Sequence, residues 1–213
     1  PKVANLGPPS SPKTGVISEA LYKFIEDFSD NKKTKYKCIE DFLKNDYPDI
    51  KSLKSGGNII DYSKDIIDES INAVKKLNSS FLLIQGPPGA GKTYTSAKII
   101  LSLIKDKKKV GINSNSHKAI NNLLLKIEEL AAEENFKFEG FKKSSKKVDK
   151  FNGKNIRESR IELVTKNCLI YAGTAWLFSD ARLDQQLDYV FIEEAGQVSL
   201  ANSIAIATVT KNI

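Results

Sequence analysis

The 213-residue sequence contains no methionine, one tryptophan, one histidine and two cysteines. Cys38 and Cys168 lie far apart in the chain, and His117 has no cluster of other ligands near it in sequence. These residues therefore offer neither a disulfide framework nor a metal site. We expect both thiols to be reduced, as in a cytoplasmic protein. No apolar run reaches the ~18 residues of a transmembrane helix, so no membrane span is predicted.

The two ends of the sequence also lack features of a complete protein. The chain starts with Pro1 without any methionine, and its last residues, 210–213, have the composition of an approach to another strand. We therefore expect a fragment of a longer protein.

Charge and hydrophobicity place the chain among globular proteins, with 28% charged and 40% hydrophobic residues. The 33 lysines and arginines exceed the 26 acidic residues, which gives a formal net charge of +7. Such an excess suits a polyanionic partner, although many lysine-rich proteins bind none. The lysine-rich stretches 105–109 and 142–154 are therefore open to two interpretations, a track for phosphates or a solvated face.

One run of residues fits the phosphate-binding loop (P-loop) pattern GxxxxGK[ST], and its context is suitable. Apolar residues 81–84 before it predict a short buried strand, and residues 94–104 after it predict a helix. Glycines allow a tight turn whose N–H groups point at phosphate oxygens, and the start of the helix favours the same anion. The run consists of Gly86, Pro87, Pro88, Gly89, Ala90, Gly91, Lys92 and Thr93.

A second candidate element follows the apolar residues 189–192, which predict a strand ending at Glu193 and Glu194. An acid at the tip of such a strand fixes Mg²⁺ beside a P-loop. The next acid can act as general base on the attacking water. The two elements together predict a nucleoside triphosphatase.

The remaining pattern indicates an α/β fold with a mostly parallel sheet. Short apolar runs at 110–113 and 168–172 predict two more strands, and a further strand is expected somewhere within 136–160. Helical periodicity predicts three separate helices: one that begins at residue 17, one over residues 66–77 and one that begins after Ser116, a candidate N-cap. A last helix is expected over residues 199–207, and a loop at 55–58 is the candidate domain boundary.

Taken together, the P-loop and the run from Glu193 through Gln197 closely resemble the motifs of superfamily 1 helicases. The similarity is to the branch that contains the nonsense-mediated-decay helicase and the Dna-two-type nuclease-helicases. Residues 114–123 resemble motif Ia of that family, and residues 172–178 resemble its next element. The nearest resemblance is to the helicase half of bacterial proteins fused to a RecB-like nuclease, and it covers about residues 36–213.

The resemblance implies a RecA-like first motor domain over residues 58–213, truncated before the following motifs, after an N-terminal arm and helical extension over residues 1–57. It implies that ATP and Mg²⁺ bind at the P-loop, with Lys92 and Thr93 on the phosphates and the metal and Tyr94 beside them. Glu193 stands where the family has a metal-linked aspartate, a departure that lengthens the carboxylate by one methylene.

The resemblance also implies two residues for hydrolysis and a set for nucleic acid. Glu194 matches the catalytic base, and Gln197 matches the glutamine that senses the γ-phosphate. For Trp176 and Phe178 the sequence leaves two roles possible, stacking on nucleic-acid bases or packing in the core. Single-stranded nucleic acid, with DNA favoured over RNA, is expected to contact Ser114, Asn115, Ser116, His117 and Thr174.

Other functions remain open from the sequence alone. A P-loop kinase should carry lid arginines and a GTPase an Asn-Lys-x-Asp motif, and neither pattern is visible. A nucleotide-dependent binding or assembly module with little hydrolysis stays possible because of Glu193. The expected partners in the longer protein are a second RecA-like domain and, as a further possibility, a nuclease domain. Since arginines from a second domain accelerate comparable NTPases by about 10³–10⁵, we expect the isolated chain to bind ATP weakly and hydrolyse it very slowly.

Overall fold

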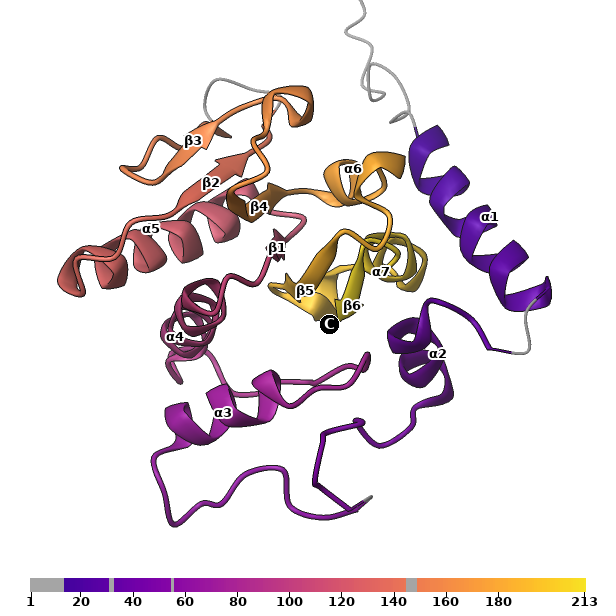
Figure 1. The fold of residues 1–213 in the computed structure, drawn as a ribbon, viewed down its shortest axis with the longest axis horizontal. Coiled ribbons are helices and arrows are strands. Elements are labelled where there is room, and N and C mark those ends of the chain that lie inside the picture. The colour runs from indigo at the N-terminus through magenta and orange to yellow at the C-terminus, as the bar shows by residue number, and fades with distance from the viewer. Residues whose placement is uncertain (1–13, 31–32, 55, 145–148) are drawn as a thin grey trace, which may run out of the picture.

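The computed structural model describes residues 14–30, 33–54, 56–144 and 149–213. Its centre is a six-stranded sheet in the order β3-β2-β4-β1-β5-β6, and every strand pair in it is parallel (Figure 1). The expected α/β fold with a parallel sheet is therefore confirmed. The strands are β1 (Val110–Asn113), β2 (Glu139–Lys142), β3 (Ile156–Glu158), β4 (Cys168–Gly173), β5 (Leu187–Ile192) and β6 (Thr210–Asn212).

Helices cover both faces of the sheet (Figure 1). On one face α3, α4 and α5 enclose a core with β1 and β4, and on the other α1, α6 and α7 enclose a second core with β4 and β5. The helices are α1 (Gly15–Asp30), α2 (Lys37–Lys44), α3 (Ile66–Lys75), α4 (Lys92–Lys105), α5 (His117–Glu133), α6 (Ala175–Phe178) and α7 (Leu200–Ala207). None of these helices combines the length and the apolar character that crossing a membrane requires.

The predicted strand over residues 81–84 is wrong in the structure. This segment runs beside the end of β6, where Leu82 N donates to Ile213 O at 2.9 Å and Ile213 N donates to Ser80 O at 3.1 Å. Residues 81–84 belong to no strand of the sheet. The predicted strands at 110–113, 168–172 and 189–192 are confirmed as β1, β4 and β5, and the residues expected to approach a strand already form β6.

The N-terminal helices pack on the sheet domain through α7 and share its core. Phe24 of α1 and Ile39 of α2 lie in one buried cluster with Ala207 of α7. The predicted arm over residues 1–15 falls almost entirely outside the described residues, and the boundary between residues 57 and 58 stays a prediction.

A single carboxylate ties the N-terminal helices to the loop before β5. Asp184 accepts a hydrogen bond from the Tyr36 hydroxyl at 2.9 Å and forms ion pairs with Lys23 at 2.6 Å and Lys35 at 3.0 Å. Burial alone would raise the pKa of Asp184, but these three donors outweigh it and hold the pKa below its ordinary value. The same contact and burial raise the pKa of Tyr36 far above its ordinary value.

Candidate nucleotide site and nucleic-acid face

The P-loop connects the segment beside β6 to α4 by a turn that only glycine adopts without strain. Gly89 and Gly91 have φ of 79° and 80°, in the left-handed region. A Cβ at either position would meet nothing within 4 Å, so the requirement for glycine is conformational rather than steric. Ala90 N closes the turn by donating to Pro87 O at 3.2 Å.

The first turn of α4 differs from those of α3, α5 and α7 because its N-cap residue has no side chain. Asp65, Ser116 and Ser199 cap α3, α5 and α7 with side-chain oxygens that accept backbone hydrogen bonds. Gly91 at the N-cap of α4 offers no such acceptor, so the N–H groups of this turn remain available to a ligand. The positive end of the helix dipole favours a phosphate at the same place.

The P-loop lysine lies folded over its own loop. Lys92 Nζ donates to the backbone carbonyls of Gly86 at 2.6 Å and Pro87 at 2.8 Å. A phosphate held by the turn would compete with these carbonyls for the ammonium group, and a charged acceptor makes the stronger hydrogen bond. The geometry therefore keeps the lysine close to the place where the N–H groups of α4 point.

The acidic pair follows the end of β5, and the two carboxylates have different surroundings. Glu193 is half-buried, and its N–H extends the β1–β5 pairing by donating to Asn113 O at 2.8 Å. Burial raises the pKa of Glu193 above its ordinary value, nearby Glu194 raises it further, and Ser96 and Lys92 act in the opposite direction. Glu194 is exposed and holds a left-handed backbone with φ of 56°, which costs about 1 kcal/mol or more for a residue with a Cβ.

Ser96 is a site residue that the sequence reasoning missed. It lies four residues after Lys92 on α4, so both side chains share one face of that helix. Ser96 is buried and its side chain hydrogen-bonds to Glu193. A small polar residue one turn after the P-loop lysine was the available signal, but only the packing of α4 against β5 shows its partner.

One cavity of about 850 Å³ brings both elements together. Lys92 and Ser96 contribute from α4, and Glu193, Glu194 and Gln197 from the turn after β5. The structure thus unites the predicted lysine, metal-linked acid, base and sensor at one place. Thr93 and Tyr94 lie on the exposed first turn of α4, outside this lining. Hydroxyl and carboxylate oxygens are the donors that Mg²⁺ prefers, so Thr93 and Glu193 fit that ion chemically.

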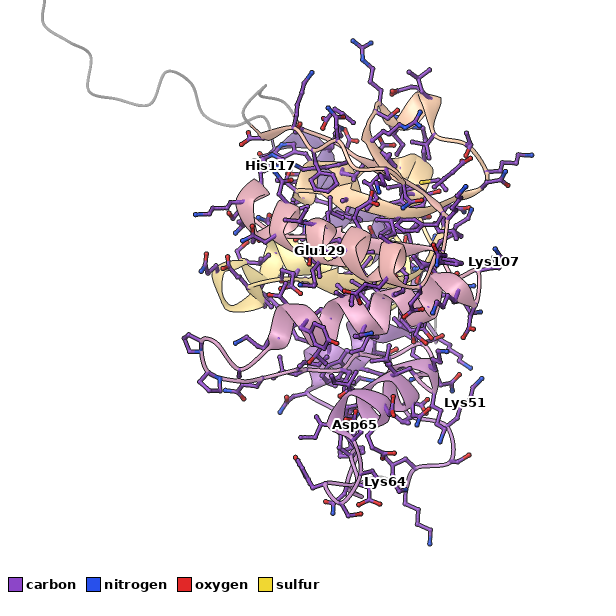
Figure 2. All side chains as sticks on the ribbon, turned by 90° about the vertical axis from the view of Figure 1, so that its left-hand side faces the viewer. Lys51, Lys64, Asp65, Lys107, His117 and Glu129 are labelled. Carbon is purple, nitrogen blue, oxygen red and sulfur yellow. The ribbon has the colours of Figure 1, made fainter. Side chains whose placement is uncertain are left out.

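The predicted nucleic-acid residues lie at the same edge of the sheet, after β1 and β4. The two strands end side by side, with Asn113 paired to Gly173. Ser116 caps α5, where its Oγ accepts from Ala119 N at 3.3 Å, and Thr174 is the N-cap residue of α6. His117 begins α5 at one end of the helix (Figure 2).

The two aromatic residues after Thr174 differ in burial, and this decides between core packing and base stacking for one of them. Phe178 is fully buried in the core on the α7 face, which assigns it to packing. Trp176 keeps 38% of its surface exposed, so base stacking remains a prediction for this residue alone.

Comparison with known proteins shows similarity to an ATPase family and to helicases. A family model described as an AAA domain matches residues 61–147. The chain is 31% identical over 152 residues to the ATP-dependent helicase NAM7 of Saccharomyces cerevisiae, covering 61% of this chain and 15% of that protein. It is 38% identical over 69 residues to the DNA replication ATP-dependent helicase/nuclease dna2 of Schizosaccharomyces pombe, covering 32% of this chain and 5% of that protein.

The chain thus spans only a small part of the length of these relatives. Its six-stranded parallel sheet flanked by helices and its P-loop are those of a RecA-like P-loop NTPase fold, and over 152 residues the chain is similar to an ATP-dependent helicase.

Proposed function

We propose that the chain is the first motor domain of a longer ATP-dependent helicase that moves along single-stranded nucleic acid. The observation that carries this proposal is the shared cavity in which Lys92 of the P-loop meets Glu193, Glu194 and Gln197. Phosphoryl transfer depends on positioning and charge, and these side chains supply both at one place.

Each residue has a separate task in the proposed hydrolysis. Lys92 and the N–H groups at the start of α4 bind the β- and γ-phosphates, and the exposed carboxylate of Glu194 accepts a proton from the attacking water. Gln197 contacts the γ-phosphate, and this contact is broken once the γ-phosphate has been released. Thr93 and Glu193 would hold Mg²⁺, which would supply positive charge beside the phosphates.

We further propose DNA over RNA as the track, a second RecA-like domain in the same polypeptide, and a nuclease of the RecB-like class fused to it. The DNA preference is supported by similarity to two proteins named as DNA replication helicase/nucleases, from Schizosaccharomyces pombe and Saccharomyces cerevisiae. A cytoplasmic location fits the two free, buried thiols.

The test is the ATPase rate of the full-length protein with and without single-stranded DNA or RNA, beside a Lys92→Ala variant. We expect nucleic acid to stimulate hydrolysis, and the variant to lose both the basal and the stimulated rate. The polymer that stimulates more strongly identifies the track. Absence of stimulation by either polymer would contradict the helicase proposal.

A nucleotide-dependent assembly module is the second candidate, and Glu193 is the observation that favours it. Its carboxylate is half-buried and extends one methylene further than the aspartate of the family pattern, which shifts the place at which a metal would be held. This candidate predicts tight ATP binding with negligible hydrolysis under every condition of the same assay.

A further inference from the structure

Nearly all the net charge of the chain lies in one segment. Residues 136–168 contain ten basic and four acidic residues, a net charge of +6 out of the +7 of the whole chain. The described residues of this segment, 136–144 and 149–168, form β2, β3 and adjoining loops at the β3 edge of the sheet (Figure 1). Such a concentration produces a strong local field even though the total charge is modest.

None of the described cations of this segment forms an ion pair within 4 Å, although Lys143 lies near enough to Asp180 to help lower the pKa of that carboxylate. Every ion pair found in the described ranges takes its lysine or arginine from outside residues 136–168. The acids of the segment are occupied instead, since Glu158 accepts from Ser144 and Glu162 pairs with Arg182. Lys142 alone is buried, with its Nζ on the Asp149 carbonyl.

Two of these cations stand at the same sheet edge as the candidate nucleic-acid residues. All strands are parallel, so their carboxyl ends lie along one edge of the sheet in the order of the strands. Along this edge Arg160 follows β3 and Lys143 follows β2. Next to them lie Thr174 after β4 and Ser114 after β1. Lys143 N donates to Ala172 O at 2.9 Å, which fixes it beside the end of β4. Neighbouring strands are ~4.8 Å apart, so the row from Ser114 to Arg160 extends over about 15 Å.

We propose that Lys143 and Arg160 bind backbone phosphates of a single strand that crosses the ends of β1 and β4 and continues over β2 and β3. The inference rests on the proposed function for the identity of the ligand. Arg160 is exposed and Lys143 half-buried, so both charges can reach a phosphate, and the guanidinium group can bind one with two parallel hydrogen bonds. Asn115, Ser116 and Thr174 present polar side chains along the adjoining edge beside the exposed ring of Trp176, while Ser114 is buried. Polar groups beside an exposed aromatic ring suit the phosphates, sugars and bases of a single strand.

The experiment measures binding of labelled single-stranded DNA and RNA oligonucleotides to the full-length protein by fluorescence anisotropy over a series of salt concentrations. The variant is Lys143→Gln with Arg160→Gln. Each lost phosphate contact lowers the salt slope on a single strand by about 0.7, so we expect a decrease of about 1.4 and an affinity loss of about tenfold at physiological salt.

The matched control is Lys107→Gln with Lys108→Gln, which removes the same charge from the opposite, amino end of β1. Both lysines are exposed, and Lys107 lies across the molecule from His117 (Figure 2). We expect this control to bind the oligonucleotides within about twofold of the wild type, since net charge alone acts weakly through salt. All variants should bind a fluorescent ATP analogue as the wild type does, which shows that they are folded. Arg160→Gln alone, an exposed change, is the variant to use if the double variant does not fold.

The outcomes separate this inference from the proposed function. If the wild type binds and the two double variants behave alike, the basic edge does not bind the strand and only this inference is overturned. If polyglutamate displaces the oligonucleotide as well as unlabelled DNA does, the edge is a general anion surface and the inference is also overturned. If the wild type binds neither DNA nor RNA, the proposed function fails together with it.

Discussion

Asn115 Nδ2 donates a hydrogen bond of 2.7 Å to the backbone carbonyl of Gln197. The first residue belongs to the loop after β1 that is expected to contact nucleic acid, and the second to the turn that lines the nucleotide cavity. Gln197 N in turn donates to Glu194 O at 2.8 Å, so the loop, the sensor and the proposed base form one connected unit. We therefore expect a nucleic-acid strand that displaces this loop to displace the turn with Glu194 and Gln197 as well.

Asn115→Ala should reduce the stimulation of ATP hydrolysis by nucleic acid more than it reduces the basal rate. The loss of one hydrogen bond of about 1 kcal/mol corresponds to about fivefold in the stimulated rate. The measurement is the ratio of stimulated to basal rate at saturating ATP and saturating oligonucleotide.

Asn122→Ala is the matched control, because Asn122 is an exposed asparagine on α5 away from the turn. It should leave the stimulation ratio unchanged. An equal ratio for wild type and Asn115→Ala would show that the contact does not couple the two sites.

Glu194→Gln should separate nucleotide binding from hydrolysis. The amide keeps the shape of the side chain but cannot accept the proton of the water, so we expect a loss of about 10²–10⁴ in rate with little change in ATP affinity. Single-turnover hydrolysis and equilibrium binding of an ATP analogue measure the two effects. A rate near that of the wild type would assign the base to another residue.

Glu193→Asp tests the other carboxylate. Shortening the side chain preserves its charge but moves it away from buried Ser96, so the effect should fall on the Mg²⁺ concentration needed for nucleotide binding. A nucleotide affinity that depends on Mg²⁺ as in the wild type would place the metal away from Glu193.

The sequence predicted those parts of the fold that are buried on both sides. β1, β4 and β5 are continuous apolar runs because helices cover both faces of the sheet there, and the pattern is unambiguous. β2, β3 and β6 are short and carry charged residues such as Arg157 and Lys211, so hydrophobic periodicity does not mark them. The segment at 81–84 has the composition of a strand, but strand formation depends on tertiary pairing as well as on composition.

The candidate site likewise has parts that the sequence predicts and parts that only the tertiary fold shows. The P-loop and the Glu193–Glu194 pair are local patterns with a fixed chemical meaning, and the sequence located both. Ser96 beside Glu193 and Asn115 beside Gln197 depend on how α4 and the loop after β1 pack against the end of β5. Residues that are far apart in the chain acquire these partners only through the tertiary fold.

Asp184→Asn should destabilise the packing of the N-terminal helices. The variant removes the charge that Lys23 and Lys35 contact and weakens the acceptor of the buried Tyr36 hydroxyl, which we expect to cost about 2 kcal/mol of unfolding free energy. Urea denaturation measures the change. Asp106→Asn, which removes an exposed ion pair with Lys75, should cost less than about 1 kcal/mol.

The contribution of Asp184 should also depend on pH. Its pKa is below the ordinary value in the folded state, so its stabilisation is fully present above that ordinary value and is lost as the pH falls through the folded value. The unfolding free energies of wild type and Asp184→Asn should therefore converge in acid and differ by a constant amount at neutral pH. A difference that persists unchanged in acid would show that the carboxylate charge is not what stabilises the contact.

The two thiols can report which part of the protein opens first. Burial raises the pKa of both Cys38 and Cys168 to about 12, so neither forms an appreciable thiolate at neutral pH, and we expect no reaction with an aromatic disulfide reagent in the folded protein. Both should react when the protein is denatured in urea, which is the positive control. Cys38 lies in the cluster of α1 and α2, whereas Cys168 lies on β4 in the core that α1 covers only in part, so Asp184→Asn should accelerate labelling of Cys38 more than that of Cys168. Mass spectrometry of the labelled peptides distinguishes the two sites, and equal acceleration of both would mean that α1 and α2 open only together with the sheet.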